Sequence, residues 1–150
     1  MPQSLASILI HVVFSTKNRV RWIHETIQPD LHAYMAGVCT QSGCPALCVG
    51  GTDDHVHILC ALSRTVTVAA LVEEIKTAAS KWLKAKGPRY ATFHWQDGYA
   101  AFSIGRSGEE AARKYIADQK NHHAKTSFQS ELRTFLKKYD LNYDERYLWD

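Results

Sequence analysis

The segment from Ala46 to Leu62 has the sequence ALCVGGTDDHVHILCAL, two apolar runs around a compact turn. ALCVGG and HVHILCAL have the composition of β-strands, and GGTDD has the glycines and aspartates that hairpin turns favour. We therefore expect an antiparallel hairpin here. Because side chains alternate along a strand, His55 and His57 face one side of the second strand, while Val56 and Ile58 face the other.

Two further strands are predicted, one on each side of this hairpin in the sequence. Leu5–Ser15 is rich in β-branched and large apolar residues, which is typical of a strand covered on both faces. Phe93–Ile104 predicts either a fourth strand or a bent pair of strands, interrupted at Asp97 and Gly98.

The remaining segments show the spacing of amphipathic helices. Apolar residues recur at positions i, i+3, i+4 and i+7, and a Ser-x-x-Glu capping box, Ser107 and Glu110, is expected to start the third helix. The predicted helices are about Glu25–Gln41, Val68–Lys86, Ser107–His122 and Phe128–Tyr139.

The resulting order is strand, helix, strand, strand, helix, strand, followed by further helices. This is the split β-α-β order of ferredoxin-like or RRM-like domains, an α+β fold in which an antiparallel sheet carries helices on one face. Residues 1–150 are expected to form a single domain, because the length suits one hydrophobic core. The other face of the sheet is then free for a ligand, and His55 and His57 are expected to point toward it.

Composition limits the possible functions. Eighteen Lys and Arg against fifteen Asp and Glu give a net charge of +3, which permits a polyanionic partner without requiring one. The longest apolar run, Leu5–Phe14, is far shorter than the roughly 20 residues that cross a bilayer, and signal-peptide features are missing. We expect a cytoplasmic protein with no membrane partner. Its four cysteines are then expected to be reduced and packed as small apolar residues rather than bound to zinc.

The two histidines allow two interpretations. Residues two apart in a strand have Cβ atoms roughly 6.5 to 7 Å apart, so two neutral imidazoles can bind one divalent ion and leave positions for a substrate. Alternatively, they are half-exposed polar residues of a sheet. Asp53 and Asp54 could ligate as well, although turn chemistry explains them adequately.

A second pattern lies on the predicted tyrosine-bearing helix, where Tyr115 and Gln119 are four residues apart and share one face. DDHVHILC followed about sixty residues later by YIADQ resembles the HUH single-tyrosine transposases of small bacterial insertion sequences, including the relatives associated with repetitive extragenic palindromes (REP). HVVFSTKNR, FHWQDGYAAFSI and YDERYLW resemble other parts of this family in the same order, so the resemblance covers essentially the whole chain.

The resemblance implies an activity and a set of site residues. His55, His57 and Gln119 would bind Mg²⁺ or Mn²⁺, and Tyr115 would attack single-stranded DNA to form a 5′-phosphotyrosine. It also implies recognition of DNA hairpins near element ends and a homodimer in which Tyr115 can serve the partner's histidines, with SIGRSG as a flexible joint. The protein would be bacterial, and associated with the nucleoid when bound to DNA.

The sequence leaves two other functions open and offers candidate contacts to DNA phosphates. A non-cleaving module that binds single-stranded nucleic acid and a phosphoesterase that uses water are the alternatives to a transposase. His122 and His123 are interpreted only as cations favoured at a helix end. The candidate phosphate contacts are Lys17, Arg19, Arg21, Lys76, Lys81, Lys84, Arg106, Arg113 and Lys120.

Overall fold

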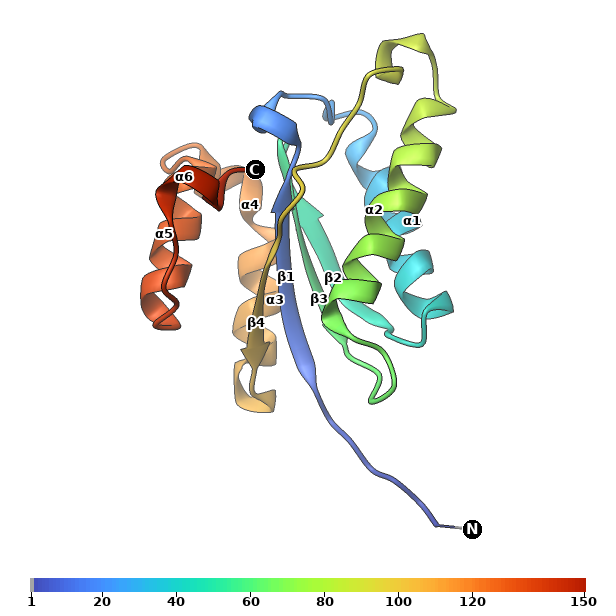
Figure 1. The fold of residues 1–150 in the computed structure, drawn as a ribbon, viewed down its shortest axis with the longest axis vertical. Helices are drawn as coiled ribbons and strands as arrows, with labels where there is room; N and C mark the ends of the chain where they lie inside the picture. The colour runs from blue at the N-terminus through green and yellow to red at the C-terminus, as the bar shows by residue number, and fades with distance from the viewer. Residues whose placement is uncertain (1) are drawn as a thin grey trace.

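The computed structural model describes residues 2–150 and has a four-stranded sheet at its centre (Figure 1). All neighbouring strands are antiparallel, and their order is β2-β3-β1-β4. The expected hairpin is therefore confirmed, and so is the α+β class with an antiparallel sheet. The strands are β1 (Leu9–Ser15), β2 (Ala46–Gly51), β3 (His55–Ala61) and β4 (Ala100–Ile104).

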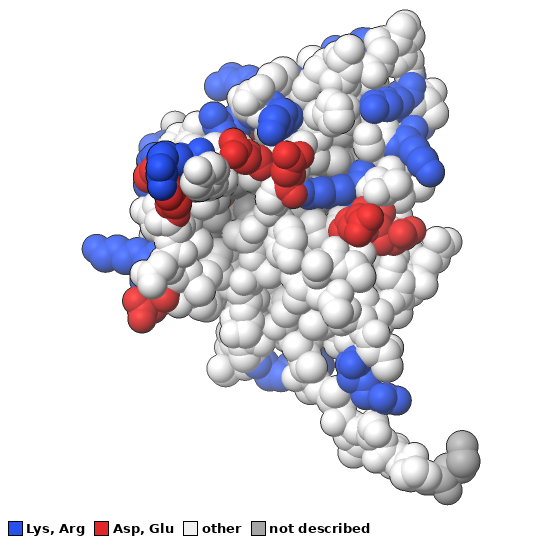
Figure 2. Space-filling view, viewed as in Figure 1, with Lys and Arg blue, Asp and Glu red and all other residues white. Residues whose placement is uncertain are grey.

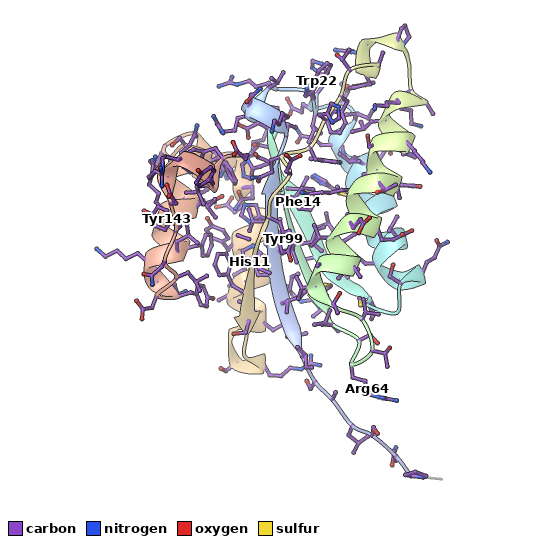
Figure 3. All side chains as sticks on the ribbon, in the orientation of Figure 1. His11, Phe14, Trp22, Arg64, Tyr99 and Tyr143 are labelled. Atoms are coloured by element: carbon purple, nitrogen blue, oxygen red, sulfur yellow. The ribbon has the colours of Figure 1, made fainter. Side chains whose placement is uncertain are left out.

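Helices α1 (Gln28–Gln41) and α2 (Val68–Lys84) cover one face of the sheet (Figure 1). Alternate residues of the central strands fill the main core on this side, including the fully buried Phe14 and Ile58, which pack with Ile75 of α2. The predicted alternation of β3 is thus confirmed. Figure 3 shows Phe14 on the α2 side of the sheet and His11 on the opposite side.

The expectation that the second face is free is wrong, because C-terminal helices cover it (Figure 1). Phe128, Leu132 and Leu136 form an apolar stripe at four-residue spacing, and they pack with Val13 and Phe102 in a second buried cluster. An amphipathic helix with such a stripe needs an apolar surface to cover it. The covering helices are α3 (Glu109–Ala117), α4 (Gln119–His123) and α5 (Phe128–Lys138), and a short α6 (Glu145–Leu148) follows.

Several strands and helices are shorter than predicted. β1 begins at Leu9 because its partners on both sides end there, at Ala61 and Ile104, and Leu5 is consequently 83% exposed. Pro29 lies in the first turn of α1, where its fixed φ suits a helix start, so this helix begins at Gln28. Of Phe93–Ile104 only β4 is a strand, and the Asp97 and Gly98 interruption lies before it. The segment also forms a single bridge from Trp95 to Thr16, the residue that follows β1.

The predicted helix Ser107–His122 differs most from what the structure shows. The Ser107 capping box does not form, because Arg106–Gly108 is a 3₁₀ turn and α3 begins at Glu109 without a side-chain cap. A break at Asp118 (φ −99°, ψ 19°) then divides the segment into α3 and α4. Tyr115 and Gln119 nevertheless remain one turn apart, and the side-chain amide of Gln119 donates to the backbone carbonyl of Tyr115 at 3.2 Å.

Helix α3 lies directly against β2, and Gly50 makes this approach possible. A Cβ atom at Gly50 would overlap the carbonyl oxygen of Ile116 on α3, so only glycine lets the helix pack this closely. The tyrosine-bearing helix is therefore positioned by backbone contact with the sheet. Within residues 2–150, none of the helices has both the length and the apolar character needed to span a bilayer.

Candidate active site

The two strand histidines lie under the C-terminal helices rather than on an open surface. His55 and His57 point to the same face of β3, and each is 0% exposed. The interpretation of them as half-exposed sheet residues is therefore wrong. Their ring centroids are 5.1 Å apart, so the two imidazoles form one compact polar site.

Tyr115 reaches this site from α3 of the same chain. It is half-buried and lines a pocket of about 460 Å³, together with His11 and residues of α5. Its ring centroid lies 5.8 Å from that of His57, and its hydroxyl donates a hydrogen bond to Glu131. Burial raises the pKa of Tyr115, and the hydrogen bond and negative charge of Glu131 raise it further, so the phenol is protonated at neutral pH.

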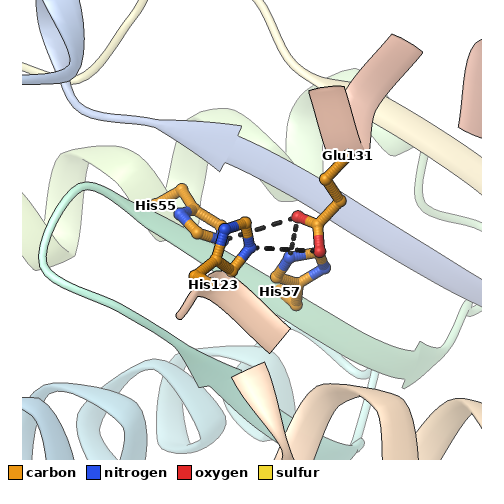
Figure 4. Close-up of side chains that lie close together, drawn as sticks. All are labelled: His55, His57, His123 and Glu131. Carbon is orange, nitrogen blue, oxygen red and sulfur yellow. Dashed lines mark hydrogen bonds and ion pairs between the residues drawn. The ribbon is translucent and has the colours of Figure 1, made fainter. Parts of the chain in front are cut away.

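Glu131, on α5, is the central carboxylate of the site and was not predicted. It is 3% exposed, and its Oε1 lies 2.9 Å from Nε2 of His57 and 3.5 Å from Nε2 of His55 (Figure 4). Burial alone would raise the pKa of Glu131, but the adjacent His123 ring and the hydrogen bond with His57 outweigh it and hold the pKa far below its usual range. Glu131 is therefore ionised.

Both strand histidines are oriented through their second ring nitrogen. Nδ1 of His55 lies 2.7 Å from Oδ1 of Asp54, and Nδ1 of His57 lies 2.7 Å from Nε2 of His11. Burial alone would raise the pKa of Asp54, but the hydrogen bond and charge of His55 keep it below its ordinary value. Asp54 is thus an acceptor and His55 donates. Burial lowers the pKa of His11 to about 3 and that of His57 to about 4, so this pair is neutral.

The contact between His55 and Gln119 suits a metal ion. With Nδ1 of His55 donating to Asp54, a neutral ring presents a lone pair on Nε2, and this atom lies 3.1 Å from Oε1 of Gln119. Two acceptor atoms at that distance repel each other unless a cation or a proton lies between them. An imidazole, an amide oxygen and an orienting Asp54 carboxylate are the ligand chemistry of a divalent metal site. The residues therefore fit such an ion.

The last residues of α4 also reach the site, although no such role was predicted for them. Nε2 of His123 lies 3.1 Å from Oε2 of Glu131, and Nε2 of His122 lies 3.2 Å from the same atom. Burial alone would lower the pKa of His123, but the adjacent Glu131 carboxylate and its charge raise it, so a proton can lie in the position that a metal ion would take. His55, His57, His123 and Glu131 form a cluster that could hold a metal ion.

The nine candidate DNA contacts separate into three groups. Arg19, Arg21 and Lys120 line a groove of about 960 Å³ that Asp54 and His123 also line, next to the buried histidines. Within this group Lys120 pairs with Glu25, and Arg21 lies 3.9 Å from Asp53. The other candidates lie elsewhere. On α2, Lys76 binds the carbonyls of residues 96–98, while Lys81 and Lys84 line a separate pocket; Arg106 and Arg113 pair with Glu109, and Lys17 pairs with Asp97.

Comparison with known proteins identifies the family. The family model described as "Transposase IS200 like" matches residues 4–119, which is most of the chain. The chain belongs to the IS200-like transposases. This confirms the resemblance inferred from the sequence motifs, and DNA transposition is the activity that the family supports. The match includes His55, His57, Tyr115 and Gln119 but ends before Glu131.

Two solved structures resemble this IS200-like transposase in fold. A candidate transposase from Deinococcus radiodurans R1 has a TM-score of 0.61 and 18% identity, over 79% of this chain and 98% of its own. A REP-associated tyrosine transposase bound to a REP hairpin has a TM-score of 0.61 and 14% identity, over 96% of this chain and 90% of its own. No curated protein sequence matches the chain.

Proposed function

We propose that this transposase cleaves and rejoins single-stranded DNA through a covalent 5′-phosphotyrosine on Tyr115. One observation supports this proposal above all. The Tyr115 hydroxyl and the Nε2 atoms of His55 and His57, which come from different elements, converge on the same buried Glu131 carboxylate within one chain. A nucleophile and two metal-binding imidazoles within reach of one point form the arrangement that phosphodiester transfer requires.

The proposed reaction exchanges one phosphate ester for another. The Tyr115 oxygen attacks phosphorus, the bond from phosphorus to the 3′-oxygen breaks, and the departing 3′-oxygen is protonated as the phenol loses its proton. The new ester retains the phosphodiester linkage, so a 3′-hydroxyl can later attack it and reseal the DNA. Because the pKa of Tyr115 is raised in the free protein, the phenol depends on a neighbouring acceptor, and Glu131 already accepts its hydrogen bond.

A divalent ion, Mg²⁺ or Mn²⁺, is part of this proposal. His55, His57 and Gln119 would hold it, and when bound it would neutralise a non-bridging oxygen of the phosphate and stabilise the leaving oxygen. The 3.1 Å separation between Nε2 of His55 and Oε1 of Gln119 supports these ligands. Asp54 and His11 hold the two imidazoles in position through their Nδ1 atoms.

Hairpin-bearing single-stranded DNA is the proposed substrate. The structural neighbour bound to a REP hairpin supports this, since it shares the fold over 96% of the present chain. Figure 2 shows Lys and Arg mostly along the upper part of the viewed face, interspersed with acidic residues. We propose the groove of Arg19, Arg21 and Lys120 as the path of the strand, because it adjoins the buried histidines.

Assembly and domain organisation stay predictions. The single domain at residues 1–150 is supported by two buried clusters that share β1, with Val12 in one and Val13 in the other. A homodimer is still proposed, but exchange of Tyr115 between subunits is not needed to form the site, because Tyr115 contacts His57 of its own chain.

An adduct assay tests the proposed function. The protein is incubated with Mn²⁺ and end-labelled single-stranded DNA that carries a hairpin flanking the element, and products are separated on a denaturing gel. We expect a covalent protein–DNA adduct that disappears in Tyr115→Phe and with excess chelator. Tyr143→Phe, a change at an exposed tyrosine far along the chain, is the matched control and retains the adduct.

Two results would contradict the proposal. Cleavage that persists in Tyr115→Phe indicates a phosphoesterase that uses water, with Tyr115 in a structural role. Tight binding of the hairpin without cleavage under any divalent metal indicates a module that only binds nucleic acid.

A further inference from the structure

Two side chains with metal-binding groups approach the strand histidines from beyond the family match, which ends at residue 119. His123 is the last residue of α4, and Glu131 lies in the first turn of α5. Their ligand atoms and those of His55 and His57 all lie within 4.8 Å of one another (Figure 4). A role for these two residues is therefore additional to the family pattern.

The hydrogen bond from His123 to Thr126 turns Nε2 of the ring toward the cluster. Its Nδ1 lies 2.6 Å from the carbonyl oxygen of Thr126, which can only accept, so Nδ1 carries the proton. Nε2 is buried and has no hydrogen-bond partner, although Oε2 of Glu131 is 3.1 Å away. The imidazole and the carboxylate are thus directed at a shared position rather than along a hydrogen bond.

The distances from Glu131 to the three histidines lie within about 0.4 Å of the edges of a tetrahedral zinc site. Bonds of about 2.0 to 2.2 Å in a tetrahedral zinc site separate the ligand atoms by about 3.3 to 3.6 Å. The Glu131 oxygens lie 2.9 Å from His57, 3.5 Å from His55 and 3.1 Å from His123. Because the four ligand atoms lie within 4.8 Å of one another, side-chain movements of about 1 Å would let all four groups bind one ion.

We propose that Glu131 and His123 complete the metal site of His55 and His57, so that three imidazoles and one carboxylate bind a single Zn²⁺-class ion. This inference concerns the DNA-free protein and rests on the proposed function in that it uses the same two strand histidines; a phosphate would have to displace one of the four ligands to reach the ion. Three nitrogen ligands and one carboxylate favour zinc over magnesium. Gln119, 3.1 Å from His55, supplies a further ligand for ions that take six.

The proposed ligands connect elements that are otherwise joined mainly by apolar contacts. β3 supplies two of them, α4 one and α5 one, so a bound ion fastens the C-terminal helices to the sheet. Metal binding should therefore protect the amides of α5 from hydrogen exchange as well as raise the melting temperature.

The test is titration with Zn²⁺ alone, without DNA. Calorimetry and melting curves with Zn²⁺ or with chelator are compared for wild type, Glu131→Gln and His123→Asn. We expect one ion per chain in wild type and a Kd at least about tenfold higher in each variant. The rise in melting temperature between chelator and Zn²⁺ should shrink in both, as should the zinc-dependent protection of residues 128–138. Each variant serves as its own reference for folding, because its metal-free melting curve is measured.

Matched controls and contrary outcomes complete the test. Glu110→Gln and His94→Asn change exposed residues of the same types, and they should bind Zn²⁺ like wild type. Wild-type affinity in both Glu131→Gln and His123→Asn, with loss in His55→Asn, would overturn this inference and leave the proposed function intact. Failure of wild type to bind Zn²⁺ would also overturn it. The titration uses no DNA, so a lost DNA adduct in Tyr115→Phe concerns the proposed function alone.

Discussion

Asp54 controls the orientation of His55 although it lies in a turn. Its carboxylate fixes the proton of His55 on Nδ1 and leaves Nε2 for an ion, which is how second-layer carboxylates act in many metal sites. Asp53, the preceding residue, lies 3.9 Å from Arg21 at the surface instead. The two neighbouring aspartates therefore have different roles, and turn chemistry explains only part of the pair.

Replacement of Asp54 by alanine should weaken metal binding without removing a ligand. We expect the Kd for Mn²⁺ or Zn²⁺ to rise about 10 to 100-fold in Asp54→Ala, because the His55 ring loses its orienting partner. Calorimetry measures the change, and Asp53→Ala provides the control with an unchanged Kd. Equal affinities for the two variants would show that Asp54 only forms the turn.

The residues of the site differ in how far sequence could predict them. His55 and His57 share a face through strand alternation, and Tyr115 and Gln119 share one through helical spacing, so local periodicity was sufficient for both pairs. Glu131 is 74 residues from His57, and its position depends on how α5 packs against the sheet. A glutamate in an amphipathic helix gives no local sign that it will be buried against histidines.

Contact between α3 and β2 is the element-scale feature on which the nucleophile depends. Gly50 lets the two backbones approach, and the residue it meets, Ile116, follows Tyr115 directly. Any displacement of α3 at this point therefore moves the phenol relative to His57.

Gly50→Ala should lower both stability and activity. Overpacking here is expected to cost about 1 to 3 kcal/mol of unfolding free energy. A shift of α3 of about 1 Å would reduce the rate of adduct formation by up to about 100-fold. Chemical denaturation and the adduct assay measure these effects. Gly37→Ala, in α1 with open space around it, should be neutral or stabilising by up to about 1 kcal/mol. A fully active Gly50→Ala would show that α3 is positioned by other contacts.

The sequence predicted which segments are helices and strands better than how these pack on the two faces of the sheet. The hairpin, the long α2 helix and the order of elements followed from periodicity and turn residues. The covering of the second face did not follow from the split β-α-β order, although the apolar composition of Leu5–Ser15 already favoured a strand covered on both faces. The break at Asp118 and the unused Ser107 cap depend on how the segment packs against the sheet, which local patterns do not contain.

Across the whole molecule, the positive charges are divided between different surfaces. Arg19, Arg21 and Lys120 lie at the groove beside the histidines, whereas Lys81 and Lys84 lie on α2, which covers the other face of the sheet. A net charge of +3 does not distinguish these surfaces. Arg19, Arg21 and Lys120 are favoured for DNA binding only because they lie beside the buried histidines.

Removal of charge from the groove should affect DNA binding more than removal from α2. The double variant Arg21→Ala, Lys120→Ala is expected to bind hairpin-bearing single-stranded DNA more weakly. When the logarithm of the association constant is plotted against the logarithm of the salt concentration, the slope for the variant should be shallower by about 0.7 for each phosphate that it no longer neutralises. Fluorescence anisotropy over a salt series measures both quantities. Lys81→Ala, Lys84→Ala removes the same charge, and a larger drop in affinity there would locate the DNA on α2.

The complete burial of His55 and His57 has a consequence for which nucleic acids can react. A duplex is a stiff rod whose phosphates stay on its outside, and helix α5 prevents such a rod from touching the imidazoles. Even a single strand can reach them only if α5 moves, because neither imidazole has exposed surface. The position of α5 would therefore decide when a phosphate can enter, before any base is recognised.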